Sequence, residues 1–168
     1  MLMEITGNAE LASTCQPAPQ AALPRRILIV EDNYFVVRQC ESALLGAGYE
    51  IVGTAVTADE AVRAAMDRRP ELVLMDIYLP GKRDGVDAAV EIFQRLGIRS
   101  VFASAPTDAA MKARAESAQP LAWLAKPFND RKLIATVMSA FGDIDALLPL
   151  NPDGAVQVGA EVSRPLLI

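Results

Sequence analysis

Residues 72–80 have the sequence LVLMDIYLP, in which four apolar residues lead into the carboxylate of Asp76. A short apolar run bounded by turn-forming residues is typical of a strand buried in a sheet. In open α/β folds, ligands bind in the crevice at the carboxyl ends of the strands. The sequence therefore places Asp76 at the edge of a sheet where such folds bind their ligands.

Two further apolar runs also end in charged side chains. Residues 27–30 lead into Glu31 and Asp32, and residues 121–125 lead into Lys126. One carboxylate after a strand carries little information. Three acids and a lysine at the ends of three different strands are difficult to explain by packing, so we treat them as one candidate site.

Strand and helix patterns alternate five times between residues 25 and 141. Five consecutive βα units predict an α/β fold, with a parallel sheet and helices on both of its faces. The short connections favour a doubly wound sheet, because an eight-stranded barrel would need about twice this length. We expect strands at residues 26–30, 49–55, 72–75, 100–104 and 121–125, and helices at residues 33–45, 57–69, 84–97, 107–117 and 129–142.

Local signals mark the ends and the buried faces of several helices. Thr57 and Glu60 have the spacing of a capping box, in which each side chain accepts from the other residue's backbone N–H. Asn129 is expected to cap the last helix, and Gly142 to end it. Apolar residues at helical spacing predict two buried faces: Val86, Val90, Phe93 and Leu96 in one helix, and Leu133, Ile134, Val137, Met138 and Phe141 in the other.

The composition is that of a folded globular domain. Of the 168 residues, 52% are hydrophobic and 22% are charged, and no apolar run approaches the roughly 18–20 residues of a membrane-spanning helix. The absence of histidine excludes histidine acid–base chemistry, histidine metal sites and histidine phosphorylation on this chain. No secretory signal is visible, so we expect Cys15 and Cys40 to be reduced and the protein to be cytoplasmic.

The net charge of −5 arises at the two ends of the chain. Residues 24–141 contain 15 basic and 15 acidic residues and are neutral, whereas residues 1–23 contribute −2 and residues 142–168 contribute −3. Because no segment forms a basic stripe, we expect no nucleic-acid binding.

The sequence divides into a flexible leader at residues 1–24, one folded domain at residues 25–141 and a tail at residues 142–168. Within the tail, residues 151–154 (NPDG) are a strong turn signal, and residues 155–158 alternate like a strand. Two interpretations stay open. The tail is either disordered or an arm that docks on this domain or on a second copy in a homodimer.

The predicted topology brings Glu31, Asp32, Asp76, Ser104 and Lys126 to one crevice. Three nearby carboxylates repel one another, and one ammonium group cannot neutralise them. A hard divalent cation with oxygen ligands can, which indicates Mg²⁺. Such a site suits phosphoryl transfer, in which a carboxylate is the nucleophile and the metal and lysine hold the phosphoryl oxygens.

With these residues, the chain resembles the receiver domain of bacterial two-component response regulators, the CheY-like family. The resemblance covers residues 25–141 and implies a flavodoxin-like sheet with strand order 2-1-3-4-5. Because only 27 residues follow Phe141, too few for a typical DNA-binding domain, we expect a stand-alone, single-domain regulator. Four motifs carry the resemblance, in the order that the family has them: ILIVED at 27–32, MDIYLP at 75–80 followed by Asp84-Gly85, FASA at 102–105 and WLAKPF at 123–128.

The resemblance implies a role for each residue of the site. Asp76 matches the phosphoacceptor. Asp32 matches a direct Mg²⁺ ligand and Glu31 an acid that acts through water, while the backbone carbonyl of Tyr78 would complete the protein's share of the metal shell. Lys126 would pair with the phosphoryl group.

Two further positions match the switch of the family. Ser104 would bond a phosphoryl oxygen and draw the following loop inward, and Trp123 stands at the switch aromatic. The Lys126–Pro127 peptide bond is expected to be cis. Because Trp123 is larger than the usual aromatic at this position, an inward swing would need more room. Trp123 also lacks the Tyr hydroxyl.

The leading interpretation is a signalling module rather than an enzyme. A histidine kinase or a histidine phosphotransfer protein would supply the phosphoryl group, and a downstream protein target would respond to it. A degenerate receiver that binds proteins without phosphorylation is the alternative. A phosphatase that forms an aspartyl-phosphate would need a second acid where this chain has Tyr78.

Overall fold

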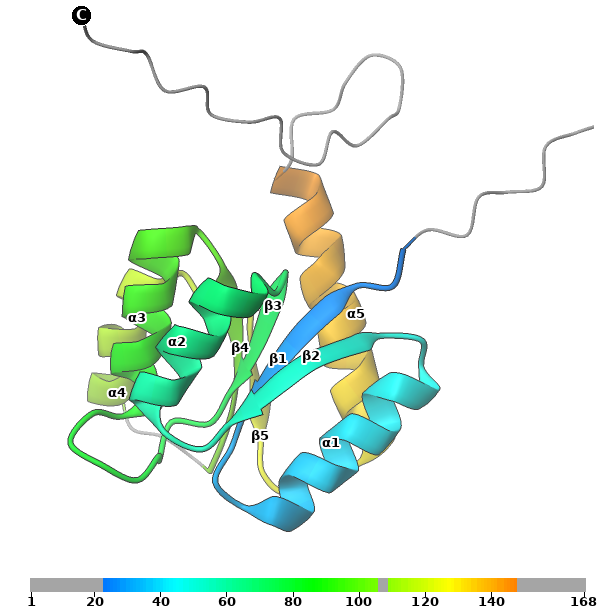
Figure 1. Ribbon diagram of the computed structural model, residues 1–168, viewed down its shortest axis with the longest axis horizontal. Coiled ribbons are helices and arrows are strands. Elements are labelled where there is room, and N and C mark those ends of the chain that lie inside the picture. The colour runs from blue at the N-terminus through cyan, green and yellow to red at the C-terminus, as the bar shows by residue number, and fades with distance from the viewer. Residues whose placement is uncertain (1–22, 106–108, 148–168) are drawn as a thin grey trace, which may run out of the picture.

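A sheet of five parallel strands forms the centre of the structure, a computed structural model that describes residues 23–105 and 109–147 (Figure 1). The strand order is β2-β1-β3-β4-β5, which confirms the predicted doubly wound, flavodoxin-like sheet. The strands are β1 (Arg26–Val30), β2 (Glu50–Ala55), β3 (Leu72–Met75), β4 (Arg99–Ser104) and β5 (Ala122–Ala125).

Helices cover both faces of this sheet, because each parallel pair of strands needs a crossover connection. In Figure 1, α2, α3 and α4 lie on one side of the sheet, and α1 and α5 lie on the other. The helices are α1 (Tyr34–Gly46), α2 (Ala58–Arg68), α3 (Gly85–Leu96), α4 (Ala109–Ala115), the 3-10 helix η1 (Glu116–Ala118) and α5 (Asp130–Leu147).

The central strands are apolar because both of their faces are covered. All four residues of β3 are buried, whereas only Val52 and Ala55 are buried in the edge strand β2. This contrast is typical of a parallel sheet between two helical layers. One apolar cluster, which includes Phe102 and Ile92, fills the side of α2 and α3. A second, which includes Leu44, Leu133 and Cys40, fills the side of α1 and α5.

The edge strand β2 departs from regular pairing. Its register with β1 shifts between Ile27 and Leu28, which leaves Val52 as an extra residue. The guanidinium of Arg68, at the end of α2, donates to the carbonyl oxygen of Val52 at 2.8 Å. A bulge of this kind bends the strand and increases its local twist.

The predicted helix caps are only partly correct. Asn129 accepts from the backbone N–H of Lys132 at 2.9 Å, as expected. Thr57 accepts from the N–H of Glu60 at 3.2 Å, but the carboxylate of Glu60 accepts from Val56, not from Thr57. The capping box is therefore half formed, because the glutamate reaches one residue further back.

The last helix is longer than the sequence suggested. Gly142 lies within α5, so the predicted end of the helix there was wrong. Beyond the glycine, Ile144 packs against the apolar cluster of α1 and α5, and Asp145 pairs with Arg25. These contacts outweigh the roughly 1 kcal/mol that glycine costs inside a helix. Residues 148–168 of the predicted tail, and the leader to residue 22, lie outside the described residues.

The predicted buried faces needed correction in two helices. In α5, Met138 is 63% exposed. In α3, Val86 is buried as expected, but the rest of the buried face is formed by Ile92 and by alanines that a search for large apolar residues does not weight. The other predicted residues lie at its border, partly buried: Val90, Phe93 and Leu96.

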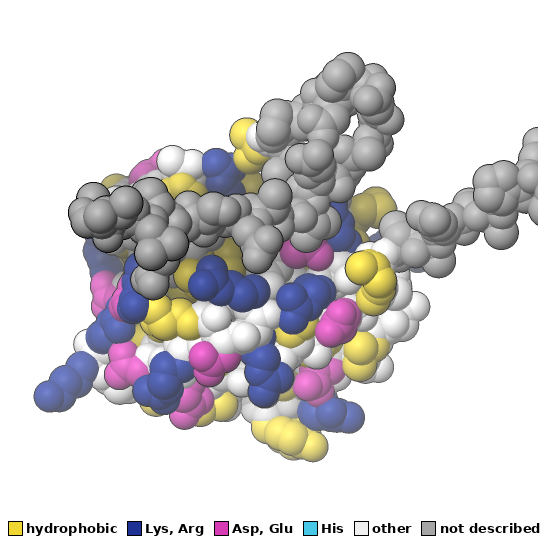
Figure 2. Space-filling model, turned by 45° about the horizontal axis from the view of Figure 1, so that its top comes forward, with side chains coloured by type: hydrophobic (Ala, Val, Ile, Leu, Met, Phe, Trp, Pro, Cys, Tyr) yellow, Lys and Arg dark blue, Asp and Glu magenta, His cyan; other side chains and the backbone are white. Residues whose placement is uncertain are grey.

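The surface carries charges of both signs. Basic and acidic side chains are intermingled over the face shown in Figure 2, in keeping with the balance of 15 basic and 15 acidic residues in residues 24–141. Among the described helices, none has the length and apolar character to cross a bilayer.

Candidate functional site

The carboxyl ends of β1 and β3 bring three acids together. Backbone hydrogen bonds continue past the ends of the strands: the N–H of Asp76 donates to Val30 at 2.8 Å, and that of Glu31 donates to Ala55 at 3.0 Å. Glu31, Asp32 and Asp76 each offer one carboxylate oxygen, and these oxygens lie within 4.8 Å of one another. The sheet therefore fixes the acids at the positions that the sequence predicted.

The three acids differ in their exposure. Glu31 and Asp76 are only 4% and 6% exposed, whereas Asp32 faces solvent. Both oxygens of Glu31 have partners, since Oε1 accepts from the N–H of Asn33 at 3.2 Å and Oε2 from Lys126 at 2.5 Å. Of the three acids, Asp32 is thus the most accessible to an ion from solvent.

Lys126 joins the acids from β5. Its Nζ lies 2.5 Å from Oε2 of Glu31 and 2.7 Å from Oδ2 of Asp76. The backbone N–H of Lys126 donates to the carbonyl oxygen of Ser104 at 2.9 Å, which ties the ends of β4 and β5 together. The Lys126–Pro127 bond is cis, as expected.

The site has more negative than positive charge. Burial raises the pKa of the Glu31 carboxyl, and the nearby charge of Asp76 adds to this effect, although Lys126 opposes both. Burial disfavours the ammonium form of Lys126, but the hydrogen bonds to Asp76 and Glu31 outweigh it, and the pKa of the lysine is raised. Three carboxylates face one ammonium group here, which is the setting that a divalent cation relieves.

Tyr78 lies at the mouth of the site. Its backbone N–H donates to Oδ1 of Asp76 at 3.3 Å, and the residue is 54% exposed. Both oxygens of Asp76 thus have protein partners, Tyr78 on one side and Lys126 on the other. The metal role of the Tyr78 carbonyl stays a prediction.

Ser104 and Trp123 lie on β4 and β5, two of the strands whose carboxyl ends carry the site. Ser104 ends β4 and is 4% exposed, and its Oγ has no hydrogen-bond partner among the described residues. Trp123, in β5, is partly buried and stacks on Phe102 with a ring separation of 4.8 Å. The Nζ of Lys112, on α4, lies 5.7 Å from the centre of the Trp123 ring. The indole therefore contacts both the core and α4.

Gly85 makes a close contact at the site that the sequence did not reveal. A Cβ atom at this position would lie 1.8 Å from the carbonyl oxygen of Asp76. The N–H of Gly85 donates to the carbonyl oxygen of Ile77 at 2.8 Å, which closes the loop after β3 onto the start of α3. The pair Asp84-Gly85 was visible in the sequence as a helix start, but its contact with Asp76 is tertiary.

This fold and this arrangement of acids and lysine define a receiver domain, and the sequence relationships agree. The chain belongs to the response regulator receiver domain family of two-component systems, whose sequence pattern matches residues 27–138. The family prediction is thereby confirmed.

Two relatives show how far the similarity extends. The transcriptional regulatory protein PdtaR of Mycobacterium tuberculosis is 40% identical over 130 residues, which cover 76% of this chain and 63% of PdtaR. The chemotaxis protein CheY of Thermotoga maritima is 32% identical over 111 residues, 66% of this chain and 92% of that protein. The chain thus spans less than two thirds of PdtaR but most of CheY.

Solved structures show the same fold. The signal receiver domain of a modulated diguanylate cyclase from Desulfovibrio desulfuricans has a TM-score of 0.68 and 30% identity, covering 73% of this chain and 98% of that one. A chain from the CheX–CheY–BeF3–Mg²⁺ complex of Borrelia burgdorferi has a TM-score of 0.66 and 27% identity, covering 71% and 90%.

Proposed function

We propose that Asp76 accepts a phosphoryl group and that the domain reports its phosphorylation through contacts with other proteins. One observation carries this proposal. The Nζ of Lys126 lies 2.7 Å from Oδ2 of Asp76 inside a cluster of three carboxylates, so an anionic nucleophile stands beside a fixed cation. A solvated acid at a strand end needs no such partner.

The donor set fits Mg²⁺. All three side chains offer carboxylate oxygens, the ligands that this ion prefers, and one of them, Asp32, is open to solvent. We assign Asp32 and Asp76 as direct ligands, Glu31 as an acid that acts through water, and the Tyr78 carbonyl as a further ligand. When bound, the cation neutralises negative charge on the phosphoryl oxygens.

The chemical step is a displacement at phosphorus. A carboxylate oxygen of Asp76 attacks the phosphorus of a phosphohistidine on the partner; the new O–P bond forms as the N–P bond breaks. The bonding electron pair stays on the imidazole nitrogen, which takes up a proton from solvent. The protein's contribution is positioning and charge, as is usual for phosphoryl transfer.

Lys126 and Ser104 stabilise the product. The lysine ammonium has three N–H donors, of which Glu31 and Asp76 use two, so one remains for a phosphoryl oxygen. The buried Oγ of Ser104, which has no partner among the described residues, is a hydroxyl able to donate to the same group. Trp123 then senses the change through its contacts with Phe102 and Lys112.

The partners follow from this chemistry. The chain has no histidine, so the phosphoryl donor is another molecule, a histidine kinase or a histidine phosphotransfer protein. We propose that the chain acts in the cytoplasm, catalyses only its own phosphorylation and dephosphorylation, and signals to a downstream protein target.

Labelling of Asp76 tests the proposal directly. Incubation with acetyl phosphate and Mg²⁺ should add one phosphoryl group to the wild type, observed by intact mass, and beryllofluoride with Mg²⁺ should change the fluorescence of Trp123. The Asp76→Asn variant should show neither effect, because the amide is not a nucleophile.

Asp59→Asn serves as the matched control, since Asp59 is an acid on the surface of α2 that pairs with Arg83 outside the site. This variant should label like the wild type. A wild type that neither labels nor responds would instead favour the degenerate receiver, and labelling of the Asp76→Asn variant would move the acceptor elsewhere.

A further inference from the structure

Helix α4 is attached to the domain by very little apolar packing. Of its seven residues, only Ala115 is buried and Met111 is partly buried. An open groove runs beside α3 and is lined in part by Val86, Val90 and, from α4, Arg114. Elements with few buried apolar contacts have low local stability, so other interactions must contribute to the position of α4.

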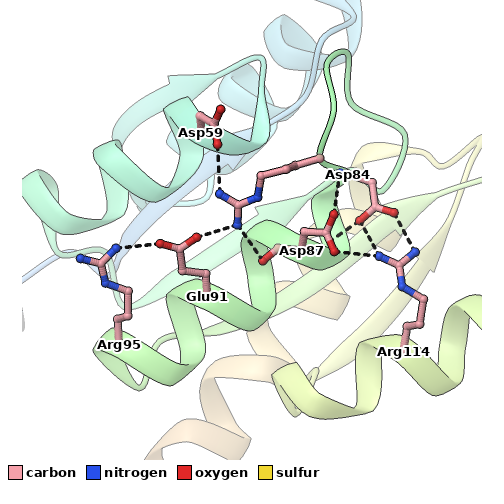
Figure 3. A network of polar contacts seen from close by, with 7 residues as sticks. Asp59, Asp84, Asp87, Glu91, Arg95 and Arg114 are labelled. Carbon is pink, nitrogen blue, oxygen red and sulfur yellow. Dashed lines mark hydrogen bonds and ion pairs between the residues drawn. The ribbon is translucent and has the colours of Figure 1, made fainter.

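Arg114 supplies such an interaction (Figure 3). Its guanidinium bonds both oxygens of Asp84, with Nη1 to Oδ2 at 2.8 Å and Nη2 to Oδ1 at 3.2 Å, and Nη2 also lies 2.9 Å from Oδ1 of Asp87. This two-pronged geometry is the one that arginine, but not lysine, provides. One side chain of α4 thus holds two acids at the start of α3.

The two acids are themselves fixed. They form a complete capping box, in which the N–H of Asp87 donates to Asp84 at 3.0 Å and the N–H of Asp84 donates to Asp87 at 3.2 Å. The next residue, Gly85, lies against the carbonyl oxygen of Asp76 without room for a side chain. A rigid connection therefore leads from the backbone of Asp76 to the partner of Arg114.

A second arginine holds the same loop from the other side. Arg83 pairs with Asp59 at 3.0 Å and with Glu91 at 2.6 Å, and so ties the loop after β3 to α2 and α3. Glu91 in turn pairs with Arg95 at 2.7 Å. Among the described residues of this network, Arg114 is the one that lies on α4, and it links that helix to α3 (Figure 3).

We propose that Arg114 is a positioning residue that, by its ion pairs with Asp84 and Asp87, holds α4 in the present arrangement and opposes the rearrangement that a phosphoryl group on Asp76 would drive. The proposal rests on the proposed function of Asp76. In the present arrangement the buried Oγ of Ser104 lacks a partner among the described residues, an unfavourable state that bonding to a phosphoryl oxygen would relieve. The ion pairs of Arg114 favour the one arrangement, and the phosphoryl group favours the other.

Linkage makes this opposition measurable. If the ion pairs stabilise only the present arrangement, then removing them must tighten the binding of any ligand that favours the other. The Arg114→Gln variant should bind beryllofluoride, at fixed Mg²⁺, about threefold more tightly than the wild type in a titration of Trp123 fluorescence, the size expected for exposed ion pairs.

Two further variants complete the design. Asp84→Asn keeps a good helix cap but loses the charge, and it should tighten binding less than Arg114→Gln does, because the ion pair between Arg114 and Asp87 remains. The double variant should bind no more tightly than Arg114→Gln alone, because that change already removes the ion pair of Asp84. Arg95→Gln is the matched control: it removes the same charge from the same network on the side away from α4, and it should bind like the wild type.

Hydrogen exchange gives a second readout that needs no ligand. The amides of residues 109–115 should exchange several-fold faster in Arg114→Gln than in wild type or Arg95→Gln. Unchanged exchange of α4, or unchanged or weaker binding in a protein whose wild type responds to beryllofluoride, overturns the role of Arg114. A wild type without any response overturns the function of Asp76 instead, and exchange of α4 still decides whether Arg114 holds the helix.

Discussion

At the scale of single residues, the site depends on a position that has no side chain. Because the nearest atom to a Cβ at Gly85 would be the backbone oxygen of Asp76, and not the end of a flexible side chain, a substitution there must move the backbone of Asp76 itself. The position of Asp76 thus depends on the absence of a side chain at Gly85, as well as on the hydrogen bonds that Asp76 makes.

We therefore expect Gly85→Ala to lower the free energy of unfolding by about 3 kcal/mol or more, as overpacking against backbone does, and to abolish labelling of Asp76. Urea unfolding and intact mass measure the two effects. Gly46→Ala is the control: a Cβ at Gly46, at the end of α1, would meet nothing within 4 Å. It should gain up to about 1 kcal/mol from the better helix propensity of alanine.

Two serines allow a second comparison at this scale. The Oγ atoms of Ser100 and Ser104 are both buried, and neither has a partner among the described residues. Because an unpaired buried hydroxyl is unfavourable, Ser100→Ala and Ser104→Ala should each leave the free energy of unfolding unchanged or raise it by up to about 1 kcal/mol. Only Ser104→Ala should reduce the change in Trp123 fluorescence with beryllofluoride. Equal responses from the two variants would remove Ser104 from the site.

At the scale of secondary structure, α5 shows how tertiary contacts override a local stop signal. Glycine commonly marks the end of a helix, yet Gly142 is followed by Ile144 and Asp145, whose partners lie on other elements. The guanidinium of Arg25 also lies 4.8 Å from the ring centre of Phe141. The end of α5 is thereby attached to the residue directly before β1.

Two truncations test this attachment. A chain that ends after Gly142 should be less stable in urea than one that ends after Leu147, by about 1–2 kcal/mol, because it loses the apolar contact of Ile144 and the ion pair of Asp145. The comparison depends only on residues 143–147, since both chains lack everything beyond. Equal stabilities would mean that the last turn of α5 adds nothing to the fold.

At the scale of the whole molecule, one buried thiol links stability to alkaline pH. Burial, with a smaller contribution from the charge of Glu31, raises the pKa of Cys40 from 9.0 to about 12. Between these pH values the unfolded chain loses a thiol proton that the folded chain keeps, so the stability of the fold falls as the pH rises.

We expect the free energy of unfolding to fall more steeply above pH 9 in a Cys15→Ser chain than in the same chain with Cys40→Ala, measured by urea unfolding at several pH values. In the former, the remaining thiol should react with a disulfide reagent only as fast as the molecule opens. Rapid reaction under native conditions would show that Cys40 is not enclosed as described.

The order of elements and most of the site could be predicted from sequence because they rest on local patterns. Apolar runs gave the strands, and a charged residue at the end of a run gave Glu31, Asp32, Asp76 and Lys126, which the parallel topology then brings together. These inferences needed only the periodicity of the chain and the rule that ligands bind at the carboxyl ends of such strands.

The remaining features depend on pairs that are distant in the chain. Arg114 and Asp84 are 30 residues apart, and no local pattern predicts that they meet. The contact of Gly85 with Asp76 and the attachment of α5 to Arg25 are of the same kind. The buried face of α3 was misjudged because it includes alanines. Alanines pack closely against the sheet but add little to a hydrophobic pattern in the sequence.

The bulge at Val52 has a consequence for how copies of this protein meet. Strand β2 is an edge of the sheet, and an unpaired edge is a template for another strand. Here the extra residue interrupts the regular spacing of its hydrogen-bonding groups, and Arg68 already occupies the carbonyl oxygen of Val52. We therefore expect this irregularity to hinder a strand of a second copy from pairing along the β2 edge.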